Sequence, residues 1–150
     1  MNIWVDADAV PVAIKELLYR AAQRTGILLT LVANQTFQIP RSPFIKFLLV
    51  ESGFDVADNQ IVKCLKPGDL VITADIPLAA LVIDKGGQAL NPRGELYTKD
   101  TIRSRLYARD VMENLRSIGV ETSGPAPMNQ KDKHRFVNHL DQILFQARKR

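Results

Sequence analysis

Cysteine, histidine and long apolar runs are all scarce in this 150-residue sequence. The single cysteine, Cys64, cannot form an internal disulfide and has no second thiol with which to bind zinc. A disulfide-stapled extracellular domain and a cysteine-based zinc module are therefore excluded. The apolar runs, such as LLTLVA, are much shorter than a bilayer-spanning helix requires, and no basic leader precedes one. We expect a cytoplasmic protein without a membrane segment.

Net charge is also absent from most of the chain. The formal charge of +4 arises entirely from residues 131–150, which carry six basic and two acidic side chains. A basic segment of this kind attracts phosphate backbones, although a solvated, soluble helix has the same composition. Aromatic side chains that could stack on bases are few, with Tyr97 and Tyr107 the candidates, which argues against single-strand recognition by stacking.

What the chain does contain is an alternation of strand-like and helix-like segments. The expected strands are residues 2–8, 27–33, 54–57, 70–74 and 88–90. The expected helices are residues 10–26, 43–52, 59–65, 77–85 and 99–119, followed by a connector at 120–130 and a basic C-terminal helix at 131–149. This order predicts a single α/β domain over residues 1–150, with helices on both faces of a mostly parallel sheet.

Polar side chains follow the expected strands. Asp6 and Asp8 end the first, Asn34 follows the second, and Asp58 and Asp75 follow the third and fourth. Because parallel strands end at one edge of a sheet, we expect these side chains to meet in one crevice. Asp6 and Asp8, two apart in an extended segment, would point the same way and lie about 7 Å apart. Four such carboxylates raise one another's pKa values or require a cation, and Mg²⁺ or Mn²⁺ suits oxygen ligands best.

Each of these carboxylates except one also has a simpler explanation. Asp8, Asp58 and Asp75 all precede expected helices and fit helix caps, and Asp69 in the stretch KPGD fits a turn. Asp6 lies within the apolar strand, where an uncompensated carboxylate is costly. The convergence of four acids, more than any single one, therefore predicts the metal site.

The stretches IWVDADAVPVAIKELLYRAAQRTG, LVAN, GFDVADNQIV, GDLVITADIPLAA and ALNPRGELYT resemble the bacterial YaiI/YqxD family over most of the chain. That family resembles the PIN-domain nucleases, which implies a PIN-like three-layer sandwich with an acidic, divalent-metal site at the strand ends. By position, Asp6 matches the first PIN aspartate, and Asp58 and Asp75 match the two later acids. Asp8 stands where PIN domains often have a polar residue, and Thr73 matches the threonine two residues before the last acid.

The sequence departs from these patterns at two places. The family typically reads DADACP, whereas Val10 stands here at the cysteine position, so any thiol role is absent. PIN nucleases usually add an acid from a middle helix. Glu51 is the candidate for that acid here, although it fits a solvated helix residue equally well.

The resemblance implies a divalent-metal-dependent ribonuclease, with Mg²⁺ or Mn²⁺ held by the four carboxylates and RNA as the partner. Asp6 and Asp75 are the expected catalytic residues. Asn34, Thr73 and Arg93 are expected to bind substrate, Arg93 through a backbone phosphate, although Arg93 would equally pair with a surface acid.

Two other functions stay open. One is a phosphatase in which the first carboxylate of the Asp-x-Asp motif attacks a phosphomonoester. The other is a non-catalytic RNA-binding or regulatory module with a structural metal site. The expected helix at 99–119 has apolar side chains that would form a homodimer contact if they are exposed. Packing in the core of the domain explains the same side chains equally well; they are Ile102, Leu106, Val111 and Leu115.

Overall fold

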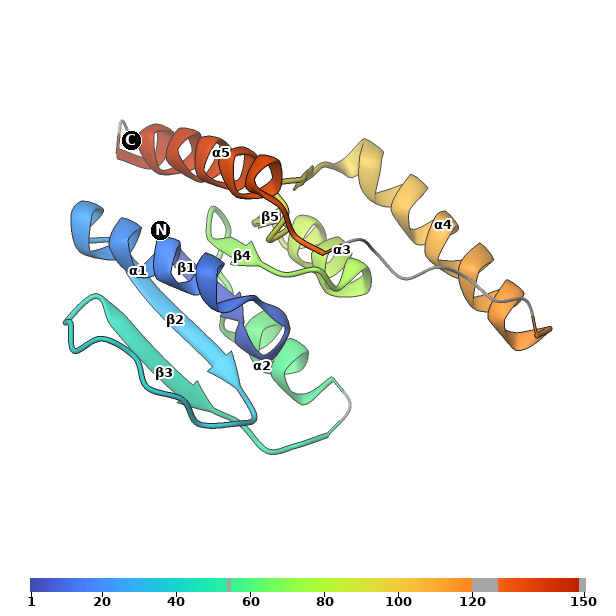
Figure 1. Ribbon diagram of the computed structural model, residues 1–150, viewed down its shortest axis with the longest axis horizontal. Coiled ribbons are helices and arrows are strands. Elements are labelled where there is room, and N and C mark those ends of the chain that lie inside the picture. The colour runs from blue at the N-terminus through green and yellow to red at the C-terminus, as the bar shows by residue number, and fades with distance from the viewer. Residues whose placement is uncertain (54, 120–126, 149–150) are drawn as a thin grey trace.

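The computed structural model describes residues 1–53, 55–119 and 127–148 (Figure 1). Along these residues the chain forms β1 (Asn2–Asp6), η1 (Ala7–Ala9), α1 (Val12–Thr25), β2 (Leu28–Ala33), β3 (Ile45–Leu49), α2 (Val56–Cys64), β4 (Leu70–Ile72), α3 (Ile76–Asp84), β5 (Gln88–Leu90), β6 (Leu96–Tyr97), α4 (Lys99–Ser117) and α5 (Gln130–Arg148). No helix within the described ranges has the length and apolar content that crossing a membrane requires.

The strands form one sheet in the order β3-β2-β1-β4-β5-β6. All neighbouring strands are parallel except β5 and β6. The chain moves outward from β1 to β3 and then returns through α2 to place β4 on the other side of β1. This reversal creates a switch point between β1 and β4, and open α/β sheets bind ligands in the crevice outside the strand ends at such a point.

Helices cover both faces of the sheet (Figure 1). On one face, α1 and α5 pack against Ile3 and Val5, and on the other, α2, α3 and α4 form the second core with Trp4. Side chains alternate between the faces along a strand, so Asp6 projects on the same face as Trp4, toward α2 and α3. The expected fold is confirmed: the protein is an α/β three-layer sandwich of the PIN-like type.

Asp69 joins the start of β1 to the start of β4. Its buried carboxylate accepts hydrogen bonds from the backbone N–H of Asn2 (2.9 Å), from the indole Nε1 of Trp4 (3.1 Å) and from the backbone N–H of Lys66 (3.0 Å). The expected turn is present, since the Asp69 amide donates to the Lys66 carbonyl. The sequence gives no sign of the two longer-range bonds, which fix the relative position of the two central strands.

Helix α4 projects from the body of the molecule (Figure 1). Of its residues only Ile102 is buried, and Tyr107, Val111 and Ile118 are 73%, 38% and 74% exposed. Packing among the described residues therefore explains Ile102 but not Val111. A homodimer formed through this helix stays a prediction.

Two expected elements are wrong. The helix expected at 43–52 is instead β3, because Ile45–Leu49 pairs in parallel with β2 and completes that edge of the sheet. The strand expected at 54–57 is wrong because α2 already begins at Val56, directly after Asp55, whose φ of 62° is left-handed. Asp58 therefore lies in the first turn of a helix rather than after a strand.

Residues 120–126 of the expected connector lie outside the described residues, and the expected C-terminal helix is α5.

Candidate functional site

A buried hydrogen-bond chain links Asp6, at the end of β1, to the segment that follows β4. Asp6 is only 9% exposed, and its Oδ2 accepts a hydrogen bond from the Thr73 hydroxyl at 3.2 Å. The same hydroxyl oxygen accepts the backbone N–H of Asp75 at 3.0 Å. Thr73, which is itself buried, thus holds the Asp6 carboxylate beside the start of α3.

Three further carboxylates form a compact cluster next to this chain. One oxygen each from Asp55, Asp58 and Asp75 lies within 4.8 Å of the others. Asp55 is the N-cap residue of α2, Asp58 lies in the first turn of α2, and Asp75 caps α3 by accepting the backbone N–H of Leu78 at 3.0 Å. Two helix N-termini therefore meet at the cluster, and their dipoles favour negative charge there.

The acids at this edge of the sheet repel one another, and this repulsion contributes to raised pKa values of Asp6 and Asp58. Burial raises the pKa of Asp6, the negative charges of Asp75 and Asp8 raise it further, and the Thr73 hydrogen bond acts in the opposite direction. The pKa of Asp58 rises to about 7 through burial first, then through the charge of Asp75 and a hydrogen bond shared with it, with smaller contributions from Asp6 and Asp55. None of the groups that shift these two pKa values is a lysine or arginine. A proton on Asp58, which the raised pKa favours, reduces the repulsion.

The donor set fits a hard divalent cation. The cluster offers carboxylate oxygens alone, without the thiolate or imidazole that would favour zinc. Bonds of about 2.1 Å to Mg²⁺ place opposite ligands about 4.2 Å apart. The three oxygens lie within 4.8 Å of one another, which is compatible with their binding one such ion together.

Residues 4–146 match the family described as "Uncharacterized BCR, YaiI/YqxD family". The protein belongs to this YaiI/YqxD family. A "UPF0178 protein" of Syntrophotalea carbinolica is 64% identical over 144 residues, which is 96% of this chain and 97% of the relative. Another, from Aeromonas hydrophila, is 62% identical over 148 residues, or 99% of each chain. These names state no activity. No solved structure matches significantly.

Two of the four expected metal ligands of this YaiI/YqxD protein, Asp58 and Asp75, lie in the cluster, and Asp6 adjoins it through Thr73. Asp8 takes another direction. Because residues 7–9 form η1, Asp6 and Asp8 do not lie on one extended strand, and the expectation that they share a strand face is wrong. The Oδ2 of Asp8 instead accepts the backbone N–H of Asn34 at 2.7 Å. Metal binding by Asp8 and substrate binding by Asn34 stay predictions.

Arg93 lies in the turn between β5 and β6, at the same edge of the sheet. Its Nη1 is 3.3 Å from Oδ2 of Asp132, so it does pair with an acid, one that lies in the first turn of α5. Substrate binding by Arg93 stays a prediction. Glu51, the candidate for the middle-helix acid, is exposed and lies between β3 and α2 rather than in a helix.

Asp55 is the site residue that the sequence analysis misses. A strand at residues 54–57 would keep Asp55 and Asp58 apart. Because α2 begins at Val56, the two residues are instead neighbours at the start of this helix. The stretch SGFDVADNQ contains the usable signal: an aspartate at a helix N-cap position, three residues before a second aspartate.

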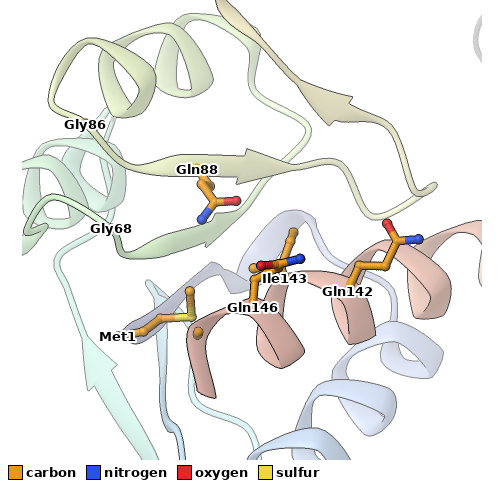
Figure 2. A pocket seen from close by; sticks show the side chains of 8 residues that line it. Met1, Gly68, Gly86, Gln88, Gln142, Ile143 and Gln146 are labelled. Carbon is orange, nitrogen blue, oxygen red and sulfur yellow. The ribbon is translucent and has the colours of Figure 1, made fainter. Parts of the chain in front are cut away.

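A hollow lies at the opposite edge of the sheet, where β1, β4 and β5 begin (Figure 2). Its volume is about 710 Å³, and the side chains of Gln88, Gln142 and Gln146 lie around it together with Met1 and Ile143. None of the described residues that line it carries a carboxylate, an imidazole or a thiol. The hollow therefore lacks groups for acid–base or metal chemistry, and the acidic edge is the better candidate.

Proposed function

We propose that this protein is a divalent-metal-dependent hydrolase that cleaves phosphodiester bonds of RNA. The observation that supports it is the cluster of three carboxylates, which lies beside buried Asp6 at the switch point of the sheet. Such a group of like charges is costly unless a cation binds there. The support for RNA as substrate is the resemblance of the strand-end motifs to PIN nucleases together with the basic helix α5.

Asp55, Asp58 and Asp75 are the residues that would hold Mg²⁺ or Mn²⁺. When bound, such an ion supplies Lewis acidity toward a phosphate group and its attacking water. Asp6 would accept the proton of that water, because burial raises its pKa above that of an ordinary aspartate and so makes it a stronger base. Thr73 fixes Oδ2 of Asp6 and thereby sets the direction of the carboxylate. The N-terminus of α3 orients Asp75 through the backbone N–H of Leu78, and the start of α2 carries Asp55 and Asp58.

The test is Mn²⁺ binding by calorimetry, combined with cleavage of a labelled single-stranded RNA in Mn²⁺. We expect Asp58→Asn and Asp75→Asn to weaken Mn²⁺ binding at least about tenfold and to remove cleavage, as chelator does in the wild type. Asparagine also caps helices, so Asp75→Asn leaves the start of α3 intact. Asp110→Asn, an exposed substitution on α4, is the matched control and should behave as the wild type.

The proposal fails if Asp75→Asn, or Asp6→Asn, cleaves RNA as fast as the wild type. Turnover of a phosphomonoester through a phosphate covalently bound to Asp6 would instead support the phosphatase. RNA binding that persists in chelator, with no cleavage in Mn²⁺, would support the non-catalytic module.

A further inference from the structure

A pocket of about 420 Å³ opens at the carboxyl edge of the sheet, next to the segments that lead into α1 and α5. It is separate from the hollow at the opposite edge, and its volume lies within the range of about 300–1,000 Å³ that small ligands occupy. Loops after three different strands contribute to its lining, which includes Ala9, Pro11, Ala74, Pro92, Arg93 and Met128.

The pocket shares two loops with the acidic site. Ala74 stands between Thr73 and Asp75, and Ala9 follows Asp8 directly. Ala9 belongs to the segment after β1 and Ala74 to the segment after β4, so the pocket straddles the same switch-point crevice as the acids. A ligand in this pocket therefore lies against segments that directly adjoin Asp8, Thr73 and Asp75 in the chain.

One wall of the pocket is held rigidly. The side chain of Asn91 donates to the Tyr97 hydroxyl at 2.8 Å and accepts the backbone N–H of Arg93 at 2.7 Å, which fixes the turn after β5. Gly94 then packs so closely on α5 that a Cβ there would lie 2.6 Å from the backbone nitrogen of Phe136. With the Arg93–Asp132 contact, these interactions preform the wall before any ligand binds.

The chemistry of the lining suits a nucleotide. Pro11 and Met128 offer apolar surface for the face of a base, and none of the described residues that line the pocket is acidic. Arg93 brings a guanidinium group, which recognises phosphate oxygens well. A base can reach such a surface only when it is unstacked and unpaired, as in a single strand.

We propose that this pocket binds one nucleoside of a single-stranded RNA whose phosphodiester lies at the acidic cluster. The identity of the strand rests on the proposed function, whereas nucleotide binding by the pocket is testable without cleavage. The pocket would supply binding energy for the strand and exclude duplex RNA from the site.

The test uses Ala9→Leu, which fills the pocket from an exposed position without changing an acid of the cluster. The probes are adenosine 5′-monophosphate, observed by NMR titration in Mg²⁺, and a labelled six-nucleotide RNA cleaved in Mn²⁺. The leucine side chain would occupy space that the ligand needs. We therefore expect nucleotide binding about tenfold weaker and the KM for RNA raised by a similar factor, with kcat and Mn²⁺ affinity unchanged.

Two further variants support the comparison. Ala108→Leu makes the same change on the exposed side of α4 and should leave all four measurements at their wild-type values. Met128→Ala removes apolar contact from the pocket and should also weaken nucleotide binding. It serves as the test if Ala9→Leu does not fold.

The outcomes separate the two proposals. If the wild type binds the nucleotide and the pocket variants do not, the pocket stands even when no RNA is cleaved, and the ribonuclease proposal alone falls. If RNA is cleaved with the same KM by the wild type and the folded pocket variants, the ribonuclease proposal stands and the pocket assignment is wrong. Failure of the wild type to bind the nucleotide also overturns the pocket assignment.

Discussion

Replacing Asp58 with asparagine should change how the stability of the metal-free protein depends on pH. In the folded protein the Asp58 carboxyl holds its proton up to about pH 7, because burial and the neighbouring Asp75 raise its pKa from 3.8 to about 7. In the unfolded chain the same group releases its proton near pH 4. The folded state therefore binds more protons between these values, so the free energy of unfolding falls as pH rises from about 4 to about 7 and is level above that. Asparagine does not titrate, so this contribution disappears in Asp58→Asn.

The size of the effect follows from the pKa shift and the exposure of the group. A shift of this size is equivalent to about 4 kcal/mol for a group fully shielded from water. Asp58 is only half-buried, and solvent screening reduces the contribution to about 1–2 kcal/mol. For a domain of this length, that corresponds to a change in Tm of about 2–8 °C.

The assay is thermal unfolding in chelator at pH 5 and pH 8. Wild type and the control Asp110→Asn should lose more stability between these two pH values than Asp58→Asn does. Adding Mn²⁺ at pH 8 should restore the wild type, because the ion neutralises the charge that the proton neutralises at pH 5. An equal loss of stability in wild type and Asp58→Asn would refute the reasoning, since it would mean that Asp58 carries no raised pKa.

Two further substitutions test the scaffold, both by urea unfolding. Asp69→Ala removes the acceptor of three hydrogen bonds, including the one from the Trp4 indole, and should cost about 3–5 kcal/mol. A loss below about 1 kcal/mol would contradict that role. Gly94→Ala adds a Cβ against the backbone of α5 at a φ of 94° and should cost at least about 2 kcal/mol. Gly68→Ala has a similar φ of 88° and open space around it, so it measures the backbone strain alone, and an equal cost in both variants would show that α5 is not closely packed.

The sequence predicts the layers of this fold well because its helices and central strands depend on local signals. The apolar runs of β2 and β4 lie in fully covered parts of the sheet, and the apolar period of α1 ends at Gly26, which is left-handed as a helix-ending glycine should be. The edge strand β3 is a different case. Ile45–Leu49 is a short apolar run that fits a helix equally well, and only its pairing with β2, a tertiary contact, makes it a strand.

The residues of the candidate site show the same difference between positions that the sequence predicts and positions that depend on tertiary contacts. Asp6 and Asp75 were predictable because each follows a strand whose direction the topology fixes. The direction of the Asp8 side chain was not predictable. It depends on the η1 turn and on the hydrogen bond from the Asn34 backbone N–H, which lies at the end of the neighbouring strand β2. Asp55 was hidden by a wrong helix start, an error of two or three residues that moved a ligand candidate out of the site.

Helix α5 has a consequence for the synthesis of the protein. Phe136, Leu140 and Leu144 of this 19-residue helix pack on the face of the sheet beside α1, although the strands beneath them are encoded far earlier. A chain emerging from the ribosome therefore exposes apolar parts of β1, β4 and β5 until α5 has also emerged. Nascent chains halted before Phe136 should consequently attract chaperones and proteases that ignore the finished protein.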